Sequence, residues 1–107
     1  MVLLPARLSG LLAAVLLAAG AASAEPPAAR QDEILHALRH DCGSCHGLTL
    51  HGGLGPALLP ASLAETPEEA LVEIVLDGLP GTPMPPWRFI LSQDEATWLV
   101  RRLKEGL

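Results

Sequence analysis

The pentapeptide Cys42-Gly43-Ser44-Cys45-His46 contains the residues most capable of chemistry in this chain. The pattern C-x-x-C-H is the site at which haem is attached covalently through two thioethers. Two thiols three residues apart on one turn can add to the two vinyl groups along one edge of the porphyrin. His46, directly after the second thiol, is then brought beneath the iron as the proximal ligand. The spacing therefore predicts one haem c, bonded to Cys42 and Cys45, with His46 on the metal.

Three other interpretations of C-x-x-C are a thioredoxin-like redox pair, half of a zinc site and a structural disulfide. A thioredoxin-like pair belongs in a βαβ context, and this chain has no run of alternating β-branched strand sequence. A zinc site could draw on His36, His40 and His51, so composition alone does not exclude it. His36 and His40 lie four residues apart and could also hold a metal as a pair, although on an exposed helix flank such histidines are more often solvated. Haem is the favoured interpretation.

A second axial ligand is predicted in residues 79–87, a segment too rich in proline and glycine for a helix. It contains Met84, the one methionine besides Met1. A lone methionine usually fills a gap in a core, but flanking prolines reduce the entropy lost when such a loop is fixed. We expect Met84 to bind the iron opposite His46, with His36, His40 and His51 as rivals. A thioether ligand raises the reduction potential.

The loop predicted over residues 47–60 is rich in glycine, which lets a backbone lie close against a flat macrocycle. Pro56 in this loop cannot donate a backbone hydrogen bond, but its carbonyl can accept one. We expect it to accept from the ring N–H of His46 and so to orient the imidazole. The alternative is an ordinary turn proline.

Residues 1–24 predict a secretory signal peptide. Arg7 supplies the positive charge, an uncharged apolar stretch covers residues 8–22, and Ala22-Ser23-Ala24 forms an A-x-A cleavage site. The apolar stretch is short for a bilayer span, which needs about 20 residues. We therefore expect cleavage after Ala24, no stable membrane anchor, and one small periplasmic domain over residues 25–107. Export agrees with the C-x-x-C-H motif, because this haem attachment occurs on the exported side of the bacterial membrane.

The net charge of the mature chain argues against some classes of binding partner. Of seven basic residues only Arg7 is lost with residues 1–24, which leaves six basic against twelve acidic residues and a net charge of −6. Such a chain is not expected to bind nucleic acid or an anionic membrane surface.

The remaining sequence predicts three or four helices joined by long loops. Residues 25–30 are expected to form an extended leader, followed by a helix over residues 31–41 in which Ile34, Leu38 and Cys42 share one face. No sheet is expected.

Two further helices have recognisable starts. Thr66 is expected to cap a helix that ends at Gly78, and Ser92 to open a capping box for the final helix. The expected buried residues are Leu71, Ile74 and Val75 in the first of these helices and Ala96, Leu99, Val100 and Leu103 in the second.

The order of these motifs resembles class I cytochrome c. The resemblance covers nearly all of residues 25–107 and rests on Cys42-Gly43-Ser44-Cys45-His46-Gly47, Gly55-Pro56, Gly81-Thr82-Pro83-Met84-Pro85 and the aromatic-leucine pair Trp98-Leu99. More narrowly, residues 42–56 and 81–87 are similar to the small NirC-type cytochromes of nitrite-reductase gene clusters. The resemblance implies an all-α class I cytochrome c fold, with three to four helices and loops wrapped around one covalently bound haem.

The narrower resemblance implies a periplasmic denitrification protein. It would carry single electrons to or around the haem-d1 nitrite reductase, or act as an accessory cytochrome in maturation of the d1 haem. Because two protein ligands leave iron no open position, we expect an electron carrier rather than an enzyme. We also expect it to be a monomer with redox protein partners. The enzymatic alternative is a peroxidase-like activity in which Met84 dissociates. The chain lacks the lysine ring of commoner class I sequences, so recognition through basic charge is not expected.

Overall fold

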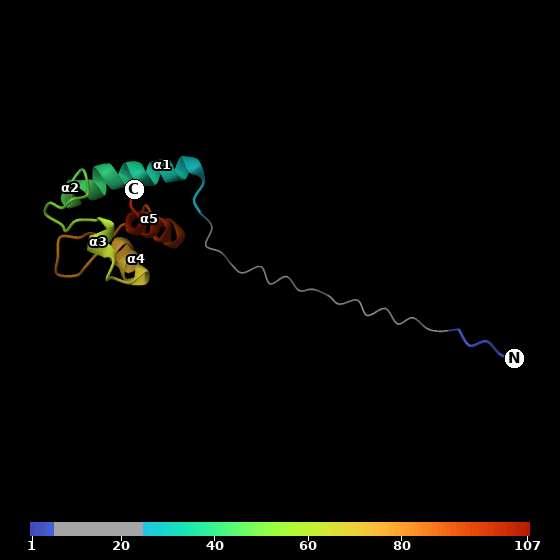
Figure 1. Ribbon diagram of the computed structural model, residues 1–107. Coiled ribbons are helices and arrows are strands. Elements are labelled where there is room, and N and C mark those ends of the chain that lie inside the picture. Colours follow the sequence, from blue (N-terminus) through green and yellow to red (C-terminus); the bar gives the residue numbers. More distant parts are fainter. Residues whose placement is uncertain (6–24) are drawn as a thin grey trace.

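The computed structural model describes residues 1–5 and 25–107, and every regular element in these two ranges is helical. In chain order the elements are α1 (Ala28–Ala37), the π-helix η1 (Leu38–Cys42), α2 (Gly43–His46), α3 (Pro60–Leu63), α4 (Glu68–Asp77) and α5 (Gln93–Glu105). Figure 1 shows α1 running into α2 as one rod above α5, with α3 and α4 below. The expected all-α fold class is confirmed.

The predicted signal peptide lies, apart from its first five residues, outside the described residues, and its cleavage stays a prediction. Within the described ranges, no helix combines the length and the apolar character needed to cross a membrane.

The first helix begins earlier than the sequence pattern predicts. The expectation of an extended leader to Arg30 is wrong, because α1 starts at Ala28, directly after Pro27. The carbonyl of Pro27 accepts a hydrogen bond from the Gln31 N–H at 2.9 Å, and the Gln31 side chain donates to the Pro26 carbonyl at 2.8 Å. The first contact is the opening backbone hydrogen bond of the helix, and the second gives the Pro26 carbonyl a partner.

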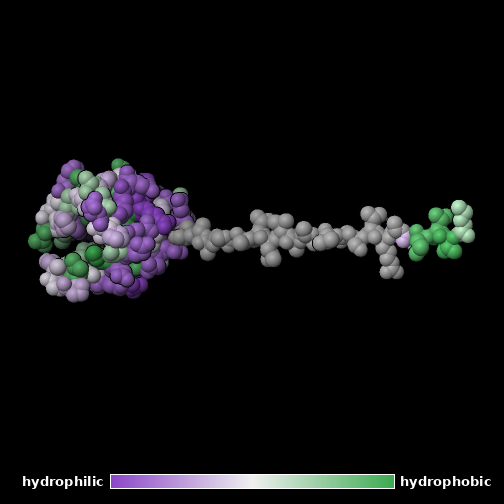
Figure 2. Space-filling model, turned by 60° about the horizontal axis from the view of Figure 1, so that its bottom comes forward, coloured by the Kyte–Doolittle hydropathy of each residue, from purple (hydrophilic) through white to green (hydrophobic). Residues whose placement is uncertain are grey.

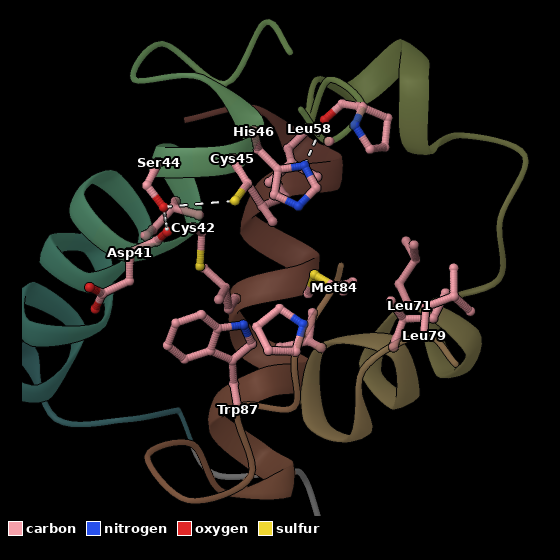
Figure 3. Close-up of a pocket in the computed structure, with 18 of the residues that line it drawn as sticks. Asp41, Cys42, Ser44, Cys45, His46, Leu58, Leu71, Leu79, Met84 and Trp87 are labelled. Carbon is pink, nitrogen blue, oxygen red and sulfur yellow. Dashed lines mark hydrogen bonds between the residues drawn. The ribbon is translucent and has the colours of Figure 1, made fainter. Parts of the chain in front are cut away.

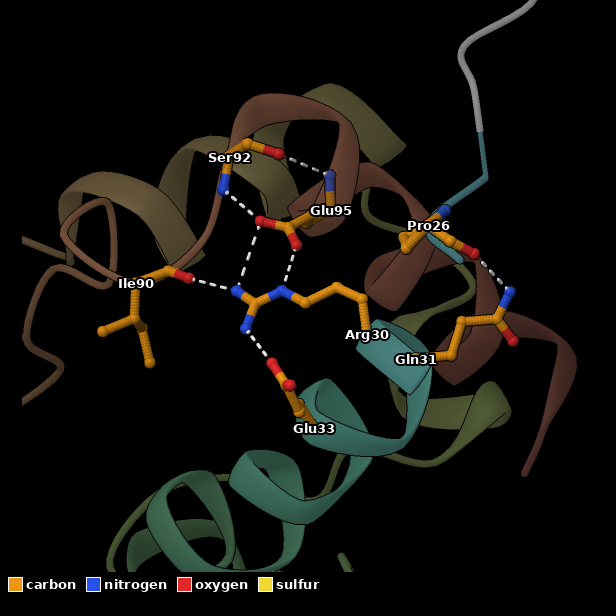
Figure 4. A network of polar contacts seen from close by, with 7 residues as sticks. All are labelled: Pro26, Arg30, Gln31, Glu33, Ile90, Ser92 and Glu95. Atoms are coloured by element: carbon orange, nitrogen blue, oxygen red, sulfur yellow. Dashed lines mark hydrogen bonds and ion pairs between the residues drawn. The ribbon is translucent and has the colours of Figure 1, made fainter. Parts of the chain in front are cut away.

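A long-range ion pair anchors the first turn of this helix. The Arg30 guanidinium donates to the Glu95 carboxylate of α5, to Glu33 at 2.7 Å, and to the Ile90 carbonyl at 2.6 Å (Figure 4). The hydrogen bonds from Arg30 and from the Ser92 N–H hold the pKa of Glu95 below its usual value. Arg30 thus joins the first turn of α1 to the start of α5, a contact between residues too far apart in sequence to be predicted from local pattern.

Helix α4 differs from the prediction in two respects. It starts at Glu68 with Pro67 in the cap position and no side-chain cap, so the predicted Thr66 cap is wrong. Its fully buried residues are Val72 and Leu76, which differ from the predicted stripe of Leu71, Ile74 and Val75. The helix ends at Gly78, as predicted, with φ +74°.

Helix α5 opens with the predicted capping box, in which Ser92 and Glu95 exchange side-chain to backbone hydrogen bonds at 3.1 and 3.0 Å. Its buried face packs with residues of the other helices into one hydrophobic core. The core consists of Ile34, Leu38, Leu50, Leu63, Val72, Leu76, Leu91, Ala96, Trp98, Leu99, Val100 and Leu103. This core holds α4 and the α1 rod on α5, and the space left between them forms the candidate site.

Candidate functional site

A cavity of about 690 Å³ lies between the C-x-x-C-H segment, α4, α5 and residues 79–87. Most of its lining is apolar, and Figure 2 shows hydrophobic residues gathered where the surface is hollowed at the left of the view. Leu71, Ile74 and Val75 line it, which explains why they are not part of the fully buried core. A cavity this large in so small a domain leaves the apolar side chains that line it without packing partners. A flat hydrophobic group bound in the cavity would cover them.

Both thiols of the C-x-x-C-H segment face this cavity (Figure 3). They are free, half-buried cysteines at the junction of η1 and α2. In η1 the Gly43 N–H bonds to the Leu38 carbonyl, five residues earlier, so one extra residue is accommodated in this turn. Such π turns are frequent at functional sites because they rotate the residues that follow. Here Cys42, Cys45 and His46 all reach the same cavity.

The chemistry of the first thiol does not fit a redox pair. Burial, with a smaller contribution from the charge of Asp41, raises the pKa of Cys42 to about 11. A thioredoxin-like pair requires a lowered thiol pKa, because the thiolate is the nucleophile. Among the described residues no group of three or more His, Cys, Asp or Glu side chains is arranged to hold a metal, so the zinc interpretation has no support in this part of the chain.

His46 is 9% exposed and is oriented by the loop that follows it. Its Nδ1 lies 2.7 Å from the Pro56 carbonyl oxygen, in the contact expected from the sequence. Because a carbonyl can only accept, Nδ1 carries the proton and donates, which leaves the Nε2 lone pair available to a metal.

Loop residues 47–59 hold this arrangement by folding back over the C-x-x-C-H segment. The Gly52 N–H donates to the His46 carbonyl and the Gly55 N–H to the Cys45 carbonyl, both at 2.8 Å. A Cβ on Gly55 would lie 2.8 Å from Cε1 of the imidazole, so only glycine allows the loop this close to the ring.

Met84 reaches the same cavity from residues 79–87, and Figure 3 shows its sulfur and the His46 ring facing one space. Its carbonyl accepts from the Leu79 N–H at 3.3 Å. The Thr82 hydroxyl donates to the Leu79 carbonyl at 2.7 Å and accepts from the Met84 N–H at 3.3 Å. The loop also packs tightly against Gly78, where a Cβ would lie 2.7 Å from the Met84 carbonyl oxygen. Met84 is therefore positioned by local hydrogen bonds and by close packing.

The role of Thr82 can be tested by replacing it with valine, which removes both hydroxyl hydrogen bonds and keeps the volume. We expect the haem-loaded protein to lose about 1 kcal/mol in the free energy of unfolding, and the bond between ferric iron and Met84, the expected ligand, to break at lower denaturant concentration. Visible absorption during a urea titration measures both effects. Thr82→Ser keeps the hydroxyl and should behave as the wild type, and equal behaviour of all three proteins would contradict this role.

The structure thus brings together Cys42, Cys45, His46, Met84 and Pro56, and it leaves His36 and His51 outside the cavity lining. His40 is exposed but also lines the cavity, whereas the sequence pattern predicted a solvated helix flank. The donor set is two thiols, one available imidazole nitrogen and one thioether on an apolar surface. These groups fit a covalently attached haem with two axial ligands.

Comparison with known proteins agrees with this chemistry. The family described as Cytochrome C oxidase, cbb3-type, subunit III matches residues 28–101. Cytochrome c55X of Pseudomonas aeruginosa is 59% identical over 87 residues, covering 81% of this chain and 73% of the relative. The chain belongs to the c-type cytochromes. The solved c-type cytochrome NirC resembles this cytochrome with a TM-score of 0.74 at 60% identity, covering 76% of this chain and 95% of that one.

A further relative is much longer than this cytochrome. The Dihydro-heme d1 dehydrogenase of Pseudomonas aeruginosa is 38% identical over 100 residues, which cover 94% of this chain and 19% of the dehydrogenase. A domain similar to this cytochrome is therefore part of that larger protein.

Proposed function

We propose that this cytochrome is a periplasmic carrier of single electrons, with one haem c attached through Cys42 and Cys45. When bound, haem supplies a one-electron ferric/ferrous couple. His46 would hold the iron on one side, with its ring kept in place by Pro56, and Met84 would hold it on the other. The presence of both donors in one cavity is the observation that supports electron transfer over catalysis, because two protein ligands leave no position for a substrate.

The lining of the cavity supports a particular kind of partner contact. Asp41 is the one carboxylate in the lining, which contains no lysine or arginine. Apolar residues at its mouth include Leu54, which is 77% exposed, and Leu79, which is 44% exposed. A redox protein would meet this surface in a small, transient contact of the kind that electron-transfer pairs use.

We place this electron transfer in the haem-d1 system of denitrification, to or around the haem-d1 nitrite reductase. This assignment rests on the resemblance of residues 42–56 and 81–87 to the NirC-type cytochromes of nitrite-reductase gene clusters, and the similarity to the solved c-type cytochrome NirC agrees with it. The second candidate is an accessory role in d1-haem maturation, which is supported by the cytochrome-like segment of the Dihydro-heme d1 dehydrogenase.

Covalent attachment is tested by staining a denaturing gel for haem. We expect the mature wild type to retain stain after boiling in detergent, and the double variant Cys42→Ala/Cys45→Ala to lose it. Each single variant should carry one thioether, as measured by its mass. A colourless wild type, made together with the haem attachment machinery, would contradict the proposal.

Mixing experiments decide between the two roles. Ferrous cytochrome is mixed with oxidised haem-d1 nitrite reductase, and ferric cytochrome with the Dihydro-heme d1 dehydrogenase and its substrate. Rapid oxidation in the first mixture alone supports the donor role, whereas rapid reduction in the second alone supports the maturation role. No exchange in either mixture would contradict both.

A further inference from the structure

Two exposed histidines of the first helical rod lie next to each other, and one of them, His40, also borders the cavity. The rings of His36, on α1, and His40, on η1, have centroids 4.2 Å apart and planes tilted by 38°. Both residues are exposed. We infer that His36 and His40 together bind a divalent transition-metal ion such as Zn²⁺, at a site separate from the haem iron.

The spacing and the ligand chemistry both favour this binding. Two histidines at positions i and i+4 of a helix project from one face and can hold one zinc ion, as in the H-E-x-x-H motif. Neutral imidazole is a good ligand for Zn²⁺, Cu²⁺ and Ni²⁺, whereas Mg²⁺ and Ca²⁺ prefer oxygen donors. Rings that already approach each other need little rearrangement to bind one ion between them.

Among the described residues, these are the two histidines in which both ring nitrogens are free of hydrogen bonds. The Nδ1 of His46 is bonded to the Pro56 carbonyl, and the Nδ1 of His51 is bonded to the Thr49 carbonyl at 2.8 Å. Within the described part of the chain, neither His36 nor His40 has a hydrogen bond or an ion pair. Their side chains therefore give up no hydrogen bond or ion pair when they bind a metal.

The backbone beneath the pair is held rigidly. Ile34 and Leu38, which are 2% and 1% exposed, alternate with the two histidines and anchor this part of the rod in the core. The Arg30 ion pair with Glu95 fixes the start of the same helix. Because little backbone entropy is lost on binding, the pair is preorganised for a metal.

Neighbouring charges favour a cation, and the number of protein ligands limits its affinity. Asp32 precedes His36 by one helical turn and Asp41 follows His40 directly, while Arg39 opposes them with one positive charge; all three are exposed. The absence of a third donor in a metal-binding arrangement among the described residues means that water must complete the coordination. The site should therefore bind a metal reversibly and more weakly than a four-ligand structural zinc site.

Calorimetric titration of Zn²⁺ into the tag-free, haem-loaded mature cytochrome tests this inference. We expect one Zn²⁺ per chain in the wild type, and binding at least tenfold weaker in each of the variants His36→Gln and His40→Gln. His51→Gln is the matched control, since it removes an exposed histidine that lies outside the pair, and it should bind like the wild type. The visible spectrum of each protein verifies that the haem site is intact.

The inference is overturned if the wild type binds no zinc, or if all four proteins bind it equally, because binding would then come from carboxylates spread over the acidic surface. It is also overturned if His51→Gln weakens binding as much as the other two variants.

Discussion

Replacing Met84 with alanine should lower the reduction potential by on the order of 0.2 V, within the span of about 0.8 V that axial ligands set in haem proteins. The thioether favours ferrous iron, and its loss leaves a position open to water or an external ligand. The covalent attachment should remain, because Cys42 and Cys45 are on other elements. Potentiometric titration measures the potential, and the rate at which the ferrous protein binds carbon monoxide measures the open position.

Leu54→Ala provides the control for this experiment. Leu54 lines the same cavity and is 77% exposed, but it has no donor atom for iron, so its removal should change neither the potential nor carbon monoxide binding greatly. An unchanged potential in Met84→Ala would contradict the assignment of this ligand. Rapid carbon monoxide binding by the wild type at neutral pH would instead favour the peroxidase-like alternative.

Replacing Gly55 with alanine should displace His46, the proposed iron ligand. The added Cβ would lie 2.8 Å from Cε1 and 2.9 Å from Nδ1 of His46, closer than atoms can approach without movement. Either the imidazole turns away from the Pro56 carbonyl or the loop moves off the C-x-x-C-H segment. We expect a loss of about 1–3 kcal/mol in the free energy of unfolding, typical of overpacking, together with weaker ligation by His46. Denaturant titration followed through haem absorption measures both.

Gly43→Ala is the matched control, since it adds the same methyl group within the C-x-x-C-H pentapeptide. Its nearest neighbour would be the Leu38 carbonyl oxygen at 3.4 Å, and its backbone is helical. Alanine is the better helix former, so this variant should be as stable as the wild type. If Gly43→Ala and Gly55→Ala lose the same stability, contact with His46 is not the cause.

Several features could be predicted from sequence because short-range interactions determine them. The Ser92 capping box and the end of α4 at Gly78 depend on residues within one turn. The hydrogen bond from His46 to Pro56 joins residues ten apart through one short loop. The C-x-x-C-H motif indicated a c-type cytochrome because its two thiols have the spacing that haem attachment requires.

Other features were decided by contacts between residues far apart in sequence. The first turn of α1 is joined to α5 by the contact between Arg30 and Glu95, which are 65 residues apart. The apolar residues of α4 follow a single helical periodicity in the sequence. Whether each of them lies in the core or at the cavity depends on where α5 and residues 79–87 pack. The π turn at residues 38–42 has no signal in the sequence, although it turns the two thiols toward the cavity together with His46.

The sequence by itself therefore determined which groups are available for chemistry, because residue type and local spacing set the ligands and the helix ends. The tertiary structure decided which of those groups lie close together. It placed Met84 and His46 at one cavity and set the rings of His36 and His40 side by side on the first helical rod. Such placements depend on the packing of whole helices, whose free energy comes from surfaces that meet only when the chain has folded.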